Sequence, residues 1–359
     1  MTDKELFELN IIEPDMDIFD KAKHNWDMLA KPIDGLGDFE TLVCNIAAIQ
    51  KKVIPDISKK ALIIMCADNG VVCENVTQTD QSVTFDVASL MAKRASSVGV
   101  MTQDYALDII PIDIGINSET KIESVIDKKI RRATGNILKE QAMSRDECLE
   151  AIRVGIDLVK ECSKKGYGMI ATGEMGIGNT TTSTALMCAL TGKDPALITG
   201  RGAGLNDEGL KNKIRVIKDS LVYHDLYDKK ANDRTDAFNA LMKVGGLDIA
   251  GLAGVFIGGA LYGIPVVIDG FISAVAALCA DMIAPGANAY MIASHTGKEK
   301  GTAIVLEYLG LKALLDADMN LGEGTGAVLI MPMLDMAMSL YRSGTRFKDT
   351  DIKEYERFK

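Results

Sequence analysis

The stretch GMIATGEMGIGNTT, residues 168–181, indicates the fold class of this chain. Residues 168–171 form a short apolar run that predicts a strand, glycines recur through residues 173–178, and Asn179-Thr180-Thr181 has the side chains of a helix start. Glycine lets a backbone approach a ligand closely, and a helix start points free N–H groups and its positive dipole end at an anion such as phosphate. A plain strand-to-helix turn is the ordinary alternative, because a lone glycine-rich loop is a weak signal.

The same alternation of apolar runs and amphipathic stretches extends in both directions along the chain. Further strands are expected at residues 61–66, 107–114 and 265–268, and most of them end in small or acidic residues. Strands that alternate with helical segments are typical of a parallel sheet with crossover helices. The fold class is therefore α/β, with a parallel Rossmann-like sheet, flanking helices, and ligands at the carboxyl ends of the strands.

Helix signals complete the expected organisation. Residues 144–166 begin with a capping box, residues 206–221 carry one apolar stripe, and residues 250–260 are rich in glycine and alanine, which predicts close helix-to-sheet packing. The polar segment 223–236 is expected to be a surface excursion. Residues 1–55 look helical with a break at 32–37, as does the tail 327–359, so we expect these ends to form a small helical subdomain beside an α/β domain at residues 56–326.

The amino-acid composition argues against several classes of function. The net charge of −10 argues against binding of nucleic acid, whose phosphates would be repelled. Seven scattered cysteines without a CxxC pair predict reduced thiols in a cytoplasmic protein, and the three histidines lack metal-ligand spacing, so no metal site is expected. The N-terminus is polar and no long apolar segment occurs, so neither export nor a membrane is indicated.

A second glycine-rich segment, LGEGTG at residues 321–326, repeats one feature of the first. Each segment places a glutamate, Glu174 or Glu323, in an expected loop that leads into a helix. Such a carboxylate is badly placed for packing but well placed to move a proton.

Three smaller motifs have two interpretations each. A helix with Lys211 and Lys213 is expected after the segment Gly200-Arg201-Gly202-Ala203-Gly204. Both lysines could be exposed charges on that helix, which is the commoner case. Alternatively, Lys213 could reach back to an anion that the glycines hold. Asp68-Asn69-Gly70 is either a turn or a ligand loop. Ser294-His295 lacks the partners of a nucleophile, so a hydrogen-bonded histidine that lines a pocket is the better interpretation.

Six motifs in a fixed order resemble the nicotinate-nucleotide:5,6-dimethylbenzimidazole phosphoribosyltransferase family, from about residue 26 to about residue 341. They are CADNGV (66–71), GEMGIGNTT (173–181), VGGLD (244–248), PVVIDGF (265–271), SH (294–295) and LGEGTG (321–326). The resemblance implies transfer of phosphoribose from nicotinate mononucleotide to a lower-ligand base for cobamide biosynthesis. It also implies a dimer and requires no cofactor, because the cationic pyridinium is already an activated leaving group.

The resemblance also assigns roles to residues. It implies that Glu323 is the general base and that Glu174 is a second carboxylate near the reacting centre. The nucleotide would be held by Gly176, Ile177, Gly178, Asn179, Thr180, Thr181, Gly202, Ala203, Gly204, Lys213 and Gly322. The base pocket would involve Thr79, Gln81, Val87, Met175, Ser294 and His295.

The chain departs from the family pattern at three places. The family usually has Asp-His-Gly where this chain has Asp68-Asn69-Gly70, a Ser-Pro or Tyr-Pro step near Thr79, and often glutamine at the position of Val87. All three are expected beside the base pocket, which leaves a benzimidazole, a purine or a phenol open as acceptor. A homodimer, a heterodimer with a paralogous subunit, and a supporting subunit with little activity alone are the corresponding alternatives for assembly.

Overall fold

The computed structural model describes residues 1–202 and 204–357. Its main sheet is parallel, in the order β3-β2-β1-β4-β5-β6. The strands are β1 Lys60–Ala67, β2 Asp108–Gly115, β3 Ile126–Asp127, β4 Met169–Met175, β5 Val266–Ile268 and β6 Met291–Ala293, and a separate pair consists of β7 His295–Gly297 and β8 Leu315–Met319. The order reverses between β1 and β4, where open α/β sheets bind their ligands. The predicted parallel Rossmann-like sheet is confirmed.

The central strand β1 shows why the apolar runs were continuous. All eight of its residues are buried. Ile63 and Met65 belong to the hydrophobic core on one face of the sheet, whereas Leu62 and Ile64 belong to the core on the other. A strand covered on both faces has no polar side to alternate with.

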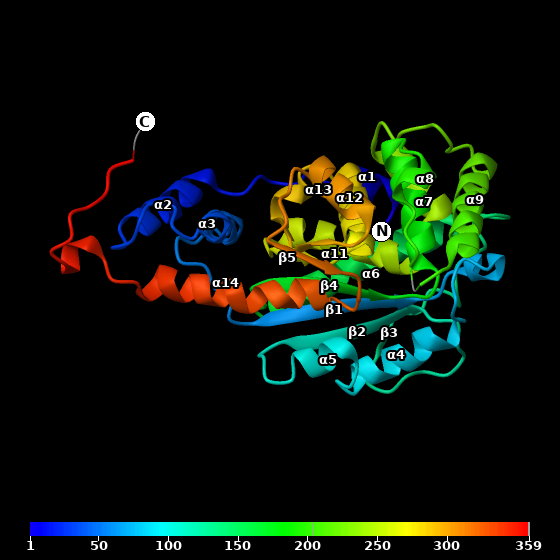
Figure 1. The fold of residues 1–359 in the computed structure, drawn as a ribbon, viewed down its shortest axis with the longest axis horizontal. Coiled ribbons are helices and arrows are strands. Elements are labelled where there is room, and N and C mark those ends of the chain that lie inside the picture. The colour runs from blue at the N-terminus through cyan, green and yellow to red at the C-terminus, as the bar shows by residue number, and fades with distance from the viewer. Residues whose placement is uncertain (203, 358–359) are drawn as a thin grey trace.

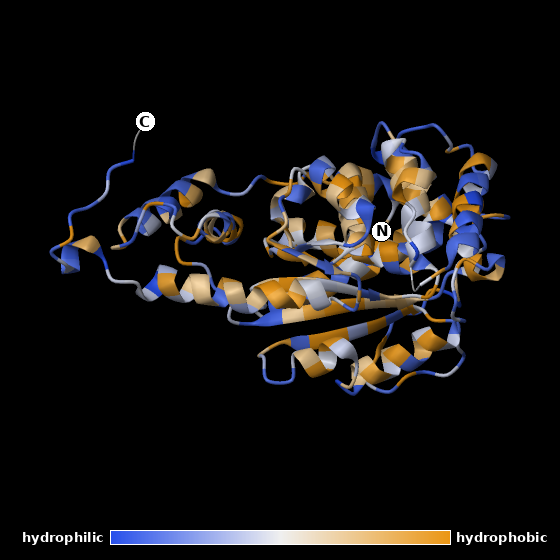
Figure 2. Cartoon of the chain, viewed as in Figure 1, coloured by the Kyte–Doolittle hydropathy of each residue, from blue (hydrophilic) through white to orange (hydrophobic). Residues whose placement is uncertain are grey.

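Helices cover both faces of the sheet (Figure 1). Their bounds are α1 Asp3–Phe7, α2 Met16–Asp27, α3 Asp38–Gln50, α4 Ser82–Ala92, α5 Ser97–Met101, α6 Arg145–Lys164, α7 Asn179–Thr191, α8 Pro195–Ile198, α9 Asp207–Tyr223, α10 Arg234–Val244, α11 Leu247–Tyr262, α12 Phe271–Ile283, α13 Lys300–Leu309 and α14 Thr325–Ser343. Three 3-10 helices are η1 Gly70–Glu74, η2 Ala287–Tyr290 and η3 Phe347–Asp349. The strands and the helices packed on them are largely hydrophobic, whereas α9 at the edge carries many hydrophilic residues (Figure 2).

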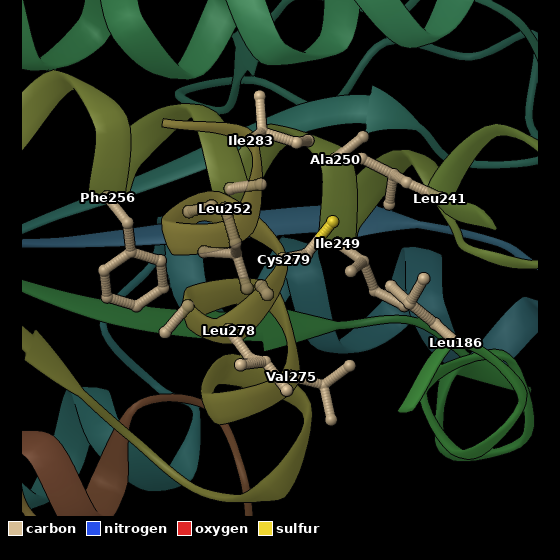
Figure 3. Close-up of a cluster of buried hydrophobic side chains, with 14 of the residues drawn as sticks. Leu186, Leu241, Ile249, Ala250, Leu252, Phe256, Val275, Leu278, Cys279 and Ile283 are labelled. Carbon is tan, nitrogen blue, oxygen red and sulfur yellow. The ribbon is translucent and has the colours of Figure 1, made fainter. Parts of the chain in front are cut away.

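The larger core lies between α7, α10, α11 and α12 (Figure 3). Leu186, Leu252, Phe256 and Val275 are among its fully or nearly fully buried side chains. The glycine-rich helix α11 packs closely, as predicted, but its tightest approach is to α6 rather than to the sheet. A Cβ atom at Gly254 would lie 2.0 Å from the carbonyl oxygen of Ile152, so glycine is what lets the two helices touch.

The two ends of the chain meet away from the pocket end of the sheet. Trp26 of α2 packs on Tyr341 of α14 with ring centroids 4.9 Å apart, and α3 also contacts α14 (Figure 1). Helix α14 runs without a break through residue 326, from the sheet to the N-terminal helices. The division at residues 55/56 and 326/327 therefore stays a prediction.

Several local expectations were wrong. Strand β4 continues to Met175, so Glu174 is a strand residue and not a loop residue. The short strands β3, β6, β7 and β8 were missed because two to five residues give little periodicity. The N-terminal region has an additional non-helical segment at residues 8–15, which contains Pro14, and regular helix ends at Ser343 in the tail.

Candidate active site

A cavity of about 320 Å³ opens at the carboxyl ends of β4 and β5. Its volume is at the lower end of the usual range for small-molecule sites, about 300–1,000 Å³. The predicted site residues that line it are Val87, Glu174, Met175, Gly176, Ile177, Asn179, Thr180, Gly202, His295, Gly322 and Glu323. Two glycine-rich segments that are remote in sequence thus form walls of one cavity.

Other predicted residues do not line this cavity. Thr79 is exposed and its hydroxyl pairs with that of Thr77, while Gln81 donates to the carbonyl oxygen of Asn69. Both belong to the turn before α4, and Gln81 also accepts a hydrogen bond from Asn117 Nδ2. Gly178, Thr181, Gly204, Lys213 and Ser294 lie behind or beside the walls, and Ala203 lies outside the described residues.

Lys213 is buried directly behind the start of α7. Its side chain is only 1% exposed, and its Nζ donates to Thr180 Oγ1 over 2.7 Å. Burial lowers the pKa of Lys213 to about 8, because a desolvated ammonium is unfavourable, and the negative charge of Glu299 offsets part of this effect. Lys211 on the same helix is exposed. The interpretation as an ordinary helix charge therefore holds for Lys211 and is wrong for Lys213.

The loop before α14 presents Glu323 to the cavity. Glu323 has φ +60°, between Gly322 at +83° and Gly324 at +85°. A left-handed conformation is uncommon for a residue with a side chain, and such strain is often found at functional sites. The Glu323 carboxylate accepts a hydrogen bond from the backbone N–H of Val98 over 3.3 Å. This contact orients the carboxylate while leaving it in the cavity wall.

Asp269 anchors this loop and was not predicted as a site residue. Its carboxylate accepts hydrogen bonds from the backbone N–H groups of Gly324 (3.1 Å), Gly326 (2.8 Å) and Ala327 (3.1 Å). These are groups at the start of α14, where the helix dipole favours an anion. The sequence feature that could have identified Asp269 is its position directly after an expected strand, in the motif PVVIDGF.

The imidazole ring of His295 is held by Ser294. Its Nδ1 lies 2.8 Å from Ser294 Oγ, whose hydroxyl donates to the carbonyl oxygen of Asp269. Since that hydroxyl has one proton, its oxygen is left to accept a hydrogen bond from Nδ1–H. The interpretation of Ser294-His295 as a hydrogen-bonded pair beside a pocket is supported by this geometry.

Gly326 provides the space for that imidazole ring, which leads to a stability prediction. A Cβ atom at Gly326 would lie 2.1 Å from His295 Nδ1. We expect Gly326→Ala to lower the free energy of unfolding by about 1–3 kcal/mol, because the ring must move within a packed wall. Gly200→Ala is the matched control, since its nearest contact would be 3.7 Å. Urea unfolding measures both, and equal midpoints would contradict the prediction.

The cavity has further walls that sequence reasoning missed. They come from Gly270 and the first turn of α12, from the residue before α13, from the end of β8 and the loop after it, and from the first residue of α14. They comprise Gly270, Phe271, Ile272, Ser273, Glu299, Met319, Asn320, Leu321 and Thr325. Glu299 and residues 319–321 lie next to the short strands β7 and β8, which were missed. Within residues 1–202 and 204–357, no helix is long and apolar enough to cross a membrane.

Comparisons with known proteins agree with the fold. A family model described as phosphoribosyltransferase matches residues 11–352. Nicotinate-nucleotide–dimethylbenzimidazole phosphoribosyltransferases of Acetivibrio thermocellus and Clostridium acetobutylicum are each 43% identical to this chain, over 94% and 96% of both sequences respectively. A crystal structure of CobT from Thermus thermophilus superposes with a TM-score of 0.87 at 32% identity, covering 94% of this chain and 100% of that one.

These relatives decide between two of the sequence-based alternatives. Their names describe enzymes, and the match extends over almost the whole chain, so the alternative of a supporting subunit with little activity finds no support. The chain is a phosphoribosyltransferase and belongs to the nicotinate-nucleotide–dimethylbenzimidazole phosphoribosyltransferase family.

Proposed function

We propose that this enzyme transfers the phosphoribosyl group of nicotinate mononucleotide to 5,6-dimethylbenzimidazole or a related base. The products are an α-riboside 5'-phosphate, used as the lower-ligand nucleotide of cobamides, and nicotinate. The observation that carries the proposal is that one cavity is bordered by the start of α7, with Lys213 buried directly behind it, and by the carboxylate of Glu323.

Each part of this cavity matches a requirement of the reaction. The start of α7 and the buried ammonium of Lys213 suit a phosphate monoester. The acceptor nitrogen bonds to C1 of the ribose, the bond from C1 to the pyridinium nitrogen breaks, and its electron pair neutralises that nitrogen. The proton of the acceptor then passes to Glu323, which is the role of a general base.

Nicotinate release by the purified chain tests the proposal directly. We expect release from nicotinate mononucleotide only when an acceptor base is present, with equal amounts of nicotinate and riboside phosphate. Release without an acceptor would indicate a hydrolase, and no release with any acceptor would refute the proposed activity.

We also propose that the enzyme works in the cytoplasm as a homodimer or a heterodimer. Exposed apolar side chains on one side of α14, among them Leu329, Met336 and Leu340, provide a surface that a second subunit would cover. Light scattering of the purified chain tests this point, and a monomer at micromolar concentration would leave only the heterodimer.

Fewer of the three departures from the family pattern border the cavity than the sequence suggested. Only Val87 lines the cavity. Asn69 is fully buried and its Oδ1 accepts from Thr182, while Thr79 is exposed, so neither lines the cavity that we propose for the base. An apolar side chain at position 87 still removes an amide that could pair with a ring nitrogen.

We therefore expect broad acceptor use with a shifted preference. When dimethylbenzimidazole and p-cresol compete at equal concentration for limiting nucleotide, mass spectrometry should detect both products, since an apolar difference is worth only about 1–3 kcal/mol. Val87→Gln should move the product ratio toward the benzimidazole. If p-cresol alone gave no product with the wild-type enzyme, this prediction would be wrong.

A further inference from the structure

One side-chain amide connects two buried carboxylates beneath the cavity. Asn179, the first residue of α7, donates through Nδ2 both to Glu174 Oε2 and to Asp248 Oδ2, the latter over 2.9 Å. Glu174 is 9% exposed, Asn179 5%, and Asp248 is fully buried. Asp248 belongs to the motif VGGLD, to which no role was given. Its other oxygen, Oδ1, has no hydrogen-bond partner in the described part of the chain.

The surroundings disfavour ionisation of both carboxylates at the same time. Asp269 and Glu323 add negative charge toward Glu174, and Asp68 adds it toward Asp248. Like charges at a desolvated site retain a proton between them. Asn179 donates one N–H group to each carboxylate but brings no positive charge, so burial outweighs these hydrogen bonds and favours a proton on one of the two.

The positions of the two carboxylates indicate which one keeps the proton. Asp248 lies in the first turn of α11, where the helix dipole favours an anion. Glu174 is the last residue but one of strand β4 and does not lie in the first turn of a helix. Burial raises the pKa of Glu174 to about 8, whereas burial raises that of Asp248 only to about 6. The helix dipole and the higher pKa both favour Glu174 as the carboxyl that keeps the proton.

The geometry also indicates which oxygen atom of Glu174 carries that proton. Oε2 of Glu174 accepts the hydrogen bond from Asn179, so the proton is on Oε1. Oε1 lies 2.8 Å from the point that a Cβ atom at Gly322 would occupy, at the wall next to Glu323. A protonated Glu174 thus presents an O–H group beside the reacting centre.

We propose that Asp248, acting through Asn179, is a positioning residue that keeps Glu174 as a neutral hydrogen-bond donor to the bound substrates, and that Glu323 alone of the two glutamates serves as the base. This inference rests on the proposed function. It assigns the role of the acid to Glu174 and that of the base to Glu323 because their environments differ, as in other enzymes that use an acid and a base in one site.

The test compares kcat from pH 6 to pH 10, at saturating nucleotide and acceptor, for the wild type, Glu174→Gln and Asp248→Asn. At saturation kcat reports groups in the complex, so Lys213, paired there with phosphate, does not produce the expected limb. In the wild type kcat should fall above about pH 8. Glutamine reproduces the protonated carboxyl, so Glu174→Gln should keep kcat within roughly tenfold at pH 7 and lose the fall at high pH.

Asp248→Asn should move the fall to lower pH by about 1 unit, because a nearby negative charge that held the proton is gone. In the Glu174→Gln background the same change should leave the profile flat. Thermal unfolding of each variant checks the fold. A merely structural role for Asp248 would lower kcat equally at every pH and would overturn the inference, as would an inactive but folded Glu174→Gln.

A second measurement does not depend on turnover. Infrared difference spectra between pH 7 and pH 9.5 should show loss of the C=O stretch of a protonated carboxylic acid in the wild type, and not in Glu174→Gln. If this band is absent at pH 7, the inference is wrong even for an active enzyme. If the band is present but no nicotinate is released, the proposed function fails while the assignment of the proton stands.

Discussion

Glu323→Gln is expected to lower kcat by roughly 10²–10⁴-fold, the usual effect of losing a positioned general base. Glutamine keeps the size of the side chain and can still receive the hydrogen bond from the N–H of Val98, so the loop should remain in place. What it loses is the ability to take a proton from the acceptor base. Steady-state nicotinate release at pH 7 measures the effect, and thermal unfolding confirms that the fold is retained.

The matched control is Glu307→Gln, an exposed glutamate on α13 away from the cavity, which should leave kcat unchanged. A phenol that ionises by itself should reduce the defect of Glu323→Gln as the pH rises, because the base is then needed less. A variant with near-normal turnover at neutral pH would show that Glu323 is not the base.

Lys213→Met is expected to raise KM for nicotinate mononucleotide by roughly 10–100-fold, with a smaller change in kcat. A hydrogen bond from a charged group contributes about 1.5–3 kcal/mol, and the phosphate is held equally before and during the reaction. Methionine fills the same buried space, so the fold should be kept. Lys211→Met on the same helix is the control, since Lys211 is exposed and should have no effect.

The pH dependence of nucleotide binding gives a second check on Lys213. Its pKa of about 8 in the free enzyme means that the ammonium is present below pH 8 and lost above it. A phosphate monoester is dianionic above about pH 6. In the wild type kcat/KM for the nucleotide should therefore fall above pH 8, and this fall should be less steep in Lys213→Met, where only the loss of the Glu174 proton remains. A KM equal to that of the wild type would remove Lys213 from the binding site.

The sequence alone was enough to predict the longer strands and helices and the candidate catalytic carboxylates. Residues 61–66 and 168–181 predicted buried strands and a strand-to-helix turn because apolar runs and helix caps act over a few neighbouring residues. The same local signals, together with six ordered motifs, were enough to assign the family and to place Glu323 in a loop.

Tertiary structure alone decided which of these groups meet. Lys213 and Lys211 look alike in sequence, and only the packing of α9 against α7 buries one and exposes the other. The Asp269 carboxylate accepts a hydrogen bond from Gly326 at the start of α14, which is far away in the sequence. Thr79 was predicted to line the base pocket, but its side chain is exposed outside the cavity. Burial, charge proximity and the meeting of remote loops depend on contacts between distant segments, and these contacts also bring the buried Glu174 beside Glu323 in one cavity.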